Sequence, residues 1–399
     1  MKLFFIRTFN DVDHIVPIVY KLAEYRERTI WVLCLNPSFD IENDFRLKFL
    51  EEKFDNIKID HIHFFAESNY AQVPEDLINQ PFLTDDPARK LLKELDATVL
   101  VFDYLIDSSQ FMADSLINAA KQLSITTIGV PPGLPIFSEG YRPDIDFYKR
   151  EVITELDYNI VPHHIDADYR IHHGFNGERI RVLGSARFCK EWRSILYNIL
   201  PTDMLPDSGN GKRLKVVYME RGADLHGKYR GVIEKTIVKI SHLDFVHFII
   251  KPHTRAGKVH FKGIPDSVEI AGNINSLNLI KWADVVIGTN SSILIEALLQ
   301  DKILLYPKYF HKDKMIFHDM NACWSVNNYG ELEEALKNIF SGNYSKPYTN
   351  QNVDRLIETV VYGGQRDRDV LGEYIEFIQI AENKGVMRSS QRLDRTSEI

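Results

Sequence analysis

Residues 283–298, which read ADVVIGTNSSILIEAL, decide the fold of this chain. The apolar run at 284–287 is typical of a buried parallel strand, and Gly288 ends it at a turn of small polar residues. A helix is expected to begin directly after this turn, with Asn290 or Ser291 as its N-cap, because short polar side chains satisfy the first N–H groups of a helix. A strand, a turn and a helix in this order form one half of a parallel βαβ unit.

The same alternation of apolar strands and amphipathic helices continues on both sides of this segment. The second half of the chain is expected to have strands at 214–219, 245–250, 268–270, 284–287 and 303–306, and helices at 229–241, 274–282, 291–299 and 330–340. The first half is expected to have strands at 2–6, 29–35, 57–65, 97–102, 126–130, 158–161 and 179–183, and helices at 14–26, 86–95 and 108–123. Strands separated by helices in this way predict two parallel sheets.

A stretch rich in Pro, Gly, Asp and Ser separates the two halves. Residues 200–213, LPTDMLPDSGNGKR, are typical of an interdomain linker. This linker predicts one Rossmann-like domain at 1–199 and a second at 214–365, followed by a helix at 366–383 that crosses back to the first domain and a frayed polar tail at 384–399. The expected fold class is α/β, with two Rossmann-like domains that face each other across a cleft and bind a ligand at the carboxyl ends of their strands.

Composition narrows the class of protein. The 399 residues are 44% hydrophobic and 26% charged, which excludes wholesale disorder. Basic residues number 48 and acidic residues 56, so the net charge is −8, which argues against a sequence-independent nucleic-acid binder. Three widely spaced cysteines exclude a disulfide scaffold and a cysteine zinc site. Because no apolar run approaches the length of a membrane span, we expect a cytoplasmic protein.

The turn at the start of the expected 291–299 helix is the first candidate site. Backbone N–H groups and the positive end of the helix dipole suit a phosphate, and Thr289, Asn290, Ser291 and Ser292 supply polar groups around it. Glu296 lies about one turn into an otherwise apolar helix, where a carboxylate can accept hydrogen bonds from both hydroxyls of a ribose. The alternative is an ordinary βα turn whose serines only cap the helix.

Cations follow two other strands of the second half. Lys251, His253 and Arg255 come directly after the expected strand at 245–250, and Arg221 and Gly222 follow the strand at 214–219. A cation or a histidine at these strand ends can offset the charge that develops on a departing phosphate. The alternative for Lys251 and Arg255 is a solvated surface position, and the alternative for Arg221 and Gly222 is a charged turn that uses glycine for its geometry.

These residues resemble a known family. Residues 214–320 resemble the donor-binding domain of the GT-B glycosyltransferases of bacterial surface-polysaccharide biosynthesis. KPH at 251–253 is similar to the His-Pro motif of sialyltransferases and Kdo transferases, and GTNSS with EAL at 288–298 is similar to their Ser-Ser motif. The resemblance implies a GT-B fold, His253 and the two serines on the donor phosphate, Glu296 on or near the ribose, and a CMP- or UDP-linked sugar as the donor.

The first half is expected to hold the acceptor and a catalytic base. His14 is the first candidate, with Asp13 as the cap of the first helix and as a possible orienting partner. Asp103, which ends the strand at 97–102, is the second candidate. Glu139 is the third and belongs to a weak match to the acidic catalytic motif of the same enzymes.

The preferred hypothesis is therefore a cytoplasmic, metal-independent and inverting glycosyltransferase, acting on a glycan or lipid-linked acceptor, with peripheral membrane contact open. No Asp-x-Asp pair stands where a metal-dependent enzyme needs one, so neither a metal nor another cofactor is expected. Two alternatives use the same fold: a UDP-sugar 2-epimerase, whose first loop the segment 10–17 resembles, and a CDP-polyol phosphotransferase. A third alternative is a non-catalytic partner that binds nucleotide-sugars within an assembly complex.

Overall fold

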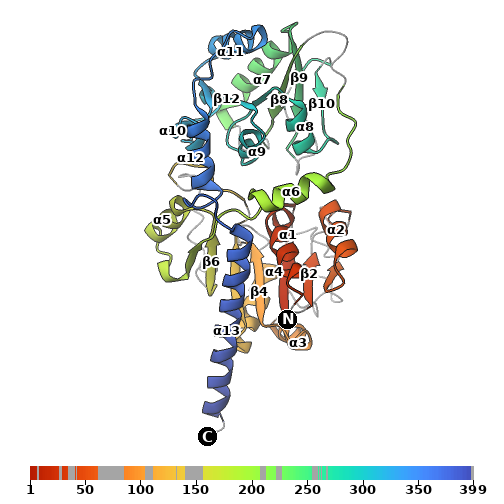
Figure 1. The fold of residues 1–399 in the computed structure, drawn as a ribbon, viewed down its shortest axis with the longest axis vertical. Helices are drawn as coiled ribbons and strands as arrows, with labels where there is room; N and C mark the ends of the chain where they lie inside the picture. The colour runs from red at the N-terminus through yellow and green to blue at the C-terminus, as the bar shows by residue number, and fades with distance from the viewer. Residues whose placement is uncertain are drawn as a thin grey trace. The chain divides into compact units, whose positions relative to one another are not determined.

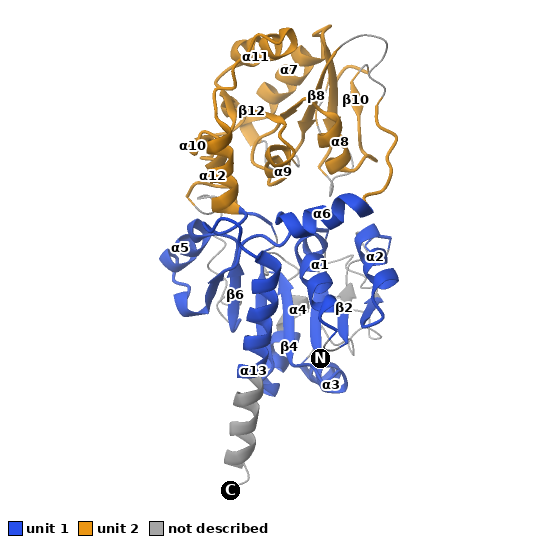
Figure 2. Ribbon diagram, in the orientation of Figure 1, with its two compact units in different colours: residues 1–134, 143–199, 361–399 blue, residues 135–142, 200–360 orange. Residues whose placement is uncertain are grey.

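The computed structural model describes residues 1–6, 9–26, 29–34, 41, 43–61, 85–103, 111–131, 133–139, 156–206, 213–221, 227–253, 259, 261, 263–266 and 268–396. The chain forms two compact units, which Figure 2 shows in different colours. Unit 1 consists of residues 1–134, 143–199 and 361–399, and unit 2 of residues 135–142 and 200–360. Each unit is a parallel α/β sheet covered by helices.

Unit 1 is built on a parallel sheet with the strand order β3-β2-β1-β4-β5-β6-β7 among its described residues. The strands are β1 (Lys2–Ile6), β2 (Ile30–Cys34), β3 (Ile57–His61), β4 (Val99–Asp103), β5 (Thr126–Val130), β6 (Tyr158–Val161) and β7 (Ile180–Val182). The helices are α1 (Phe9–Glu24), α2 (Phe45–Lys53), α3 (Asp85–Glu94), α4 (Phe111–Leu123), α5 (His164–His172), α6 (Lys190–Ile199) and α13 (Val370–Thr396). The strand order reverses between β1 and β4, the arrangement of a Rossmann-like sheet.

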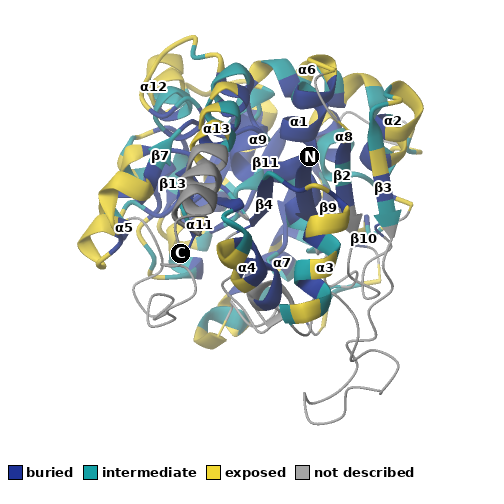
Figure 3. Cartoon of the chain, turned by 90° about the horizontal axis from the view of Figure 1, so that it is seen from below, coloured by how far each residue is buried: buried dark blue, intermediate teal, exposed yellow. Residues whose placement is uncertain are grey.

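Helices cover both faces of this sheet, which explains why its central strands read as continuous apolar runs. Leu3, Phe5, Leu100 and Phe102 point to one face, where they join a core with residues of α3 and α4. Helix α13 of the same unit packs against helix α1 and against strands β4 and β5. Figure 3 shows β4 as a buried strand.

Unit 2 has a second parallel sheet, with the strand order β10-β9-β8-β11-β12-β13 in its described part. Its strands are β8 (Leu214–Met219), β9 (Val246–Lys251), β10 (Glu269–Ile270), β11 (Val285–Ile287), β12 (Ile303–Pro307) and β13 (Trp324–Val326). Its helices are α7 (Arg230–Ser241), α8 (Ser276–Trp282), α9 (Ile293–Leu299), α10 (Ile316–Asp319), α11 (Tyr329–Ser341) and α12 (Asn350–Val360). The sheet confirms the predicted strand–turn–helix at 283–298, with β11 beside β8 and β12.

The C-terminal helix returns to the first unit, as the sequence predicts. Within unit 1, α13 lies along β4 (Figure 1). The Oγ1 of Thr126 donates to the carbonyl of Ala381 over 3.0 Å, and Lys2 Nζ forms an ion pair with Glu382 Oε2 at 3.0 Å. The expectation of a frayed tail from residue 384 is wrong, because the helix continues to Thr396.

The unit boundaries differ from the predicted domains in three places. Residues 361–365 belong to unit 1, and residues 135–142 belong to unit 2 although unit 1 surrounds them in sequence. Within the described residues of the expected linker, 200–206 and 213, Asp203 is bound to the rest of unit 2: its Oδ2 accepts hydrogen bonds from the backbone N–H of Asn275 at 2.7 Å and from Asn278 Nδ2 at 2.9 Å. Residues 207–212 lie outside the described part of the chain.

Gly184 lies in close contact with Val361 and Val370, which belong to the C-terminal segment of unit 1. Its φ is +84°, and a Cβ built there would lie 2.7 Å from the carbonyl oxygen of Val361 and 2.9 Å from Cγ2 of Val370. Gly184→Ala therefore combines backbone strain with a clash, and we expect it to lower the free energy of unfolding by about 3 kcal/mol, measured by urea denaturation. Gly174→Ala is the matched control, because Gly174 has a φ of +92° with nothing within 4 Å. Equal losses in the two variants would contradict the role of the clash.

Candidate functional site

The carboxyl end of β4 brings Asp103 to the reversal point of the unit 1 sheet. Asp103 is the last residue of β4, pairs in register with Val130 of β5, and is 6% exposed. Ligands of open α/β sheets bind where the strand order reverses, at the carboxyl ends of the strands. The structure therefore places this candidate base where an α/β enzyme carries its chemistry.

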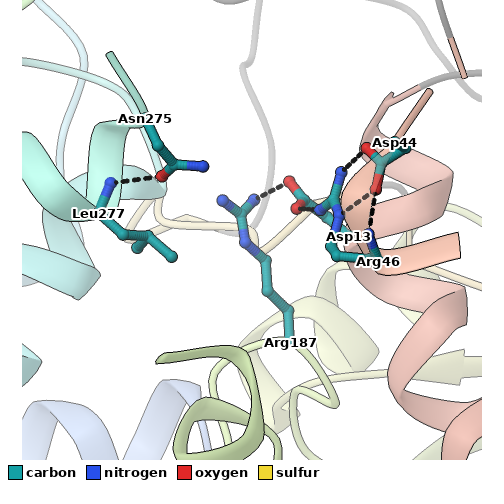
Figure 4. Close-up of polar contacts among 6 residues, drawn as sticks. All are labelled: Asp13, Asp44, Arg46, Arg187, Asn275 and Leu277. Carbon is teal, nitrogen blue, oxygen red and sulfur yellow. Dashed lines mark hydrogen bonds and ion pairs between the residues drawn. The ribbon is translucent and has the colours of Figure 1, made fainter. Parts of the chain in front are cut away.

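Asp13 belongs to an ion-pair network and does not cap α1. The helix begins at Phe9, so Asp13 lies inside it, and the predicted cap is wrong. Arg187, in the turn before α6, contacts Asp13 with Nη1 at 2.8 Å from Oδ2, and Arg46 of α2 also binds this carboxylate (Figure 4). Burial alone would raise the pKa of Asp13, but the guanidinium groups of Arg187 and Arg46 outweigh it and lower the pKa below its usual value.

Asp44 completes this network. It is the N-cap of α2, and its Oδ1 accepts hydrogen bonds from the backbone N–H and the Nε of Arg46, both at 2.9 Å. Its Oδ2 accepts from Nη2 of Arg46 at 2.6 Å. Two carboxylates and two guanidinium groups thus balance their charges on unit 1. No local sequence pattern indicates this network, because Asp13, Arg46 and Arg187 are far apart along the chain.

His14 is buried beneath the same network. The residue is 2% exposed, and its Nε2 has no hydrogen-bond partner among the described residues. Burial, reinforced by the positive charge of Arg187, lowers the pKa of His14 to about 3. The imidazole is therefore neutral at pH 7 and a weak base, since a general base works best with a pKa near the operating pH. This electrostatic environment makes His14 a poor candidate for the base at neutral pH.

Glu139 lies in unit 2, which corrects its expected place in the first half. Residues 135–139 run beside the segment before α10: Phe137 forms an antiparallel bridge with Met315, and the N–H of Ser138 donates to the carbonyl of Lys314 at 3.0 Å. Glu139 pairs with Lys314 Nζ, and both side chains are exposed. An exposed carboxylate with a lysine partner has the character of a surface ion pair.

The turn between β11 and α9 is polar and partly buried. Thr289 Oγ1 donates to Asn290 Oδ1 at 3.0 Å, and Asn290 Nδ2 donates to Asp313 Oδ2 at 3.1 Å. The N-cap of α9 is Ser292, and its side chain makes no capping hydrogen bond. The predicted caps, Asn290 and Ser291, are therefore wrong. The Ser292 hydroxyl therefore does not act as a capping group.

Glu296 is buried as its apolar surroundings predict. The residue is 2% exposed on α9, and its Oε1 accepts a hydrogen bond from Gln300 Nε2 at 3.1 Å. A buried carboxylate needs hydrogen bonds to offset its lost hydration, and Gln300 donates one of those that Glu296 accepts.

The cations of unit 2 lie at the carboxyl ends of neighbouring strands. Because β8 lies between β9 and β11, Arg221, which follows β8, sits between His253, which follows β9, and the β11 turn. Lys251 is the last residue of β9, and its Nζ donates to the carbonyls of Ala271 at 3.1 Å and Gly272 at 2.9 Å. Burial lowers the pKa of Lys251 to about 8.

The other predicted donor residues, Gly222 and Arg255, lie outside the described residues. In the part of the chain that the structure describes, no group of three or more His, Cys, Asp or Glu side chains could hold a metal ion. None of the described helices is long and apolar enough to cross a membrane.

Comparisons with known proteins identify the fold. No protein-family model matches the chain, and no curated protein matches its sequence. A solved structure of a putative UDP-N-acetylglucosamine 2-epimerase from Listeria monocytogenes is similar with a TM-score of 0.58 and 13% identity, over 90% of this chain and 94% of that one. The UDP-GlcNAc 2-epimerase from Neisseria meningitidis, bound to UDP-GlcNAc, is similar with a TM-score of 0.54 and 12% identity, over 90% and 98%.

The UDP-GlcNAc 2-epimerase from Methanocaldococcus jannaschii has a TM-score of 0.53 and 15% identity, over 90% of this chain and 99% of that chain. These similarities extend over both units. The chain has the GT-B fold, with two Rossmann-like units, which confirms the predicted fold class.

Proposed function

We propose that the protein is a UDP-sugar 2-epimerase, which inverts the configuration at C2 of a UDP-linked N-acetylhexosamine. The observation that carries the proposal is the similarity of both units to solved UDP-GlcNAc 2-epimerases over about nine tenths of the chain. The glycosyltransferase hypothesis rests on short motifs within unit 2, whereas this similarity spans both units. The alternative reached from the sequence therefore becomes the preferred function.

The chemistry requires a nucleotide site and an acid–base site, and the chain has candidates for both. In unit 2, Arg221, His253 and the Thr289–Ser292 turn would bind the diphosphate, and Glu296 would accept hydrogen bonds from the ribose. Inversion at C2 breaks a C–H bond on one face of the sugar and returns a proton to the other face. This needs a base at the reacting carbon, and Asp103 is our candidate for that role.

The proposal is tested by incubating the protein with UDP-GlcNAc in D₂O, without any acceptor and with EDTA, because we propose that no metal takes part. ¹H NMR should show the anomeric signal of the C2 epimer, UDP-N-acetylmannosamine, and deuterium should enter at C2 because the base exchanges its proton with solvent. The CMP-, CDP- and GDP-linked sugars serve as controls and should remain unchanged. An unchanged UDP-GlcNAc that releases UDP only after a glycan acceptor is added would contradict the proposal and support a glycosyltransferase.

A further inference from the structure

Glu296 is a carboxylate in an apolar environment. On α9 its neighbours Leu294, Ile295 and Ala297 are all fully buried, and Glu296 itself is 2% exposed. A carboxylate loses much of its hydration in such a place, so the hydrogen bonds that it accepts decide where it points. One of them comes from Gln300 Nε2, one helical turn later, at 3.1 Å.

The side-chain amide of Gln300 is itself held in one orientation. Its Nε2 also donates to the carbonyl of Leu277 on α8 at 3.4 Å. Both acceptors are oxygens, so the amide nitrogen must face them, because a flipped amide would oppose oxygen to oxygen. The backbone N–H of Gln300 donates to the carbonyl of Glu296 at 3.0 Å, which anchors the residue at the end of α9. Gln300 therefore ties the Glu296 carboxylate to the neighbouring helix α8.

We infer that Gln300 is a positioning residue for Glu296 and that it contributes to the preference for a ribonucleotide over a deoxyribonucleotide. The inference rests on the proposed function, in which Glu296 contacts the ribose hydroxyls. Four residues along an α-helix correspond to about 6 Å, so Gln300 lies one turn farther than Glu296 from the turn that would bind the phosphates. It acts through the carboxylate and has no contact of its own with the nucleotide.

The test measures ribose preference, which a purely structural role would not change. Isothermal titration calorimetry gives the dissociation constants of UDP and of 2′-deoxy-UDP for wild type, Gln300→Leu and Glu296→Ala. We expect Gln300→Leu to weaken UDP binding about 5- to 10-fold and 2′-deoxy-UDP binding only about twofold, because the deoxynucleotide offers the carboxylate its 3′-hydroxyl alone. Glu296→Ala should remove the preference for ribose.

Two further variants make the test specific. Gln351→Leu makes the same substitution at an exposed position of α12 in the same unit and should leave both dissociation constants unchanged. Gln300→Asn keeps an amide but shortens its reach, so it should show the same loss of ribose preference. It takes the place of Gln300→Leu in the test if that variant does not fold. Thermal unfolding of each variant separates loss of binding from loss of fold.

The outcomes distinguish this inference from the proposed function. A Gln300→Leu protein that binds UDP with the wild-type preference for ribose would overturn the inference and leave the epimerase proposal standing. A wild-type protein that binds CMP and not UDP, with a ribose preference that Gln300→Leu loses, would support the inference and contradict the proposal. A wild-type protein that binds none of these nucleotides contradicts both.

Discussion

Replacing Asp103 by asparagine should lower the rate of UDP-GlcNAc epimerisation by a factor of at least about 100, while the affinity for UDP changes less than about threefold. A positioned general base contributes about 10²- to 10⁴-fold to a rate, and asparagine keeps the shape of aspartate without its ability to take a proton. The dissociation constant should stay nearly constant because the proposed nucleotide contacts belong to unit 2. Asp103→Asn should therefore act on kcat rather than on binding.

The position of Asp103 is the reason to expect this effect. It ends a strand that is buried along its whole length, at the point where the strand order of the sheet reverses. Backbone pairing with β5 in the middle of the sheet fixes where the residue leaves the strand. A carboxylate held this rigidly suits a reaction in which base and carbon must meet in one geometry.

The measurement compares kcat, KM and the Kd for UDP in Asp103→Asn, His14→Gln and Asp168→Asn. Asp168 is an exposed carboxylate on α5 of the same unit, so its replacement should leave all three quantities unchanged. A kcat for Asp103→Asn within about threefold of wild type would remove Asp103 from the chemistry. A much larger loss in His14→Gln than in Asp103→Asn would restore His14 as the base.

The parts of the fold that depend on local pattern could be predicted from the sequence. Buried parallel strands are recognisable as short apolar runs between polar turns, and β4, β8 and β11 occur where those runs predict them. The spacing of apolar residues at 370–378 also predicts that this segment is a packed helix. These features need only the spacing of apolar residues, which the sequence displays directly.

The features that depend on long-range contacts could not be predicted in this way. Asp13 looks like a helix cap in sequence, and its role changes because Arg46 and Arg187 reach it from elsewhere in the chain. Glu139 follows β5 in sequence, but the bridge between Phe137 and Met315 holds its segment in unit 2. No local pattern indicates either contact. In their own segments Arg46 and Arg187 look like ordinary surface charges, and Phe137 and Met315 look like ordinary apolar residues.

The motifs do not decide which reaction the fold carries out, for a related reason. A histidine after one strand and serines after another bind phosphate through general electrostatics, so they suit several reactions on the same fold. They indicate an anionic ligand at the carboxyl ends of β9 and β11 without indicating what happens to it. The choice between transfer and epimerisation depends on residues that act on the sugar, and these show no comparable motif in the sequence.

Acid should destabilise the protein through His14 before it protonates most carboxylates. In the folded chain the pKa of His14 is about 3, whereas an unfolded histidine has a pKa of about 6.5. Below pH 6.5 the unfolded chain binds a proton at this residue that the folded chain does not, so the free energy of unfolding falls as the pH falls. Two pH units below 6.5, the loss from this single residue amounts to about 3 kcal/mol.

Urea unfolding of wild type and His14→Gln between pH 7.5 and pH 4.5 measures this contribution. The wild type should lose stability steeply below pH 6.5, and His14→Gln should show a shallower slope, because glutamine does not titrate. Asp13 acts in the same direction, since its pKa is lowered on folding. Its contribution to stability is lost only at the lower pH values at which carboxylates take up protons, so the slope above pH 4.5 reports on His14. His172→Gln replaces an exposed imidazole of the same unit and should keep the wild-type slope. Equal slopes in wild type and His14→Gln would show that the imidazole gains a proton in the folded protein, which would reopen His14 as an acid–base group at neutral pH.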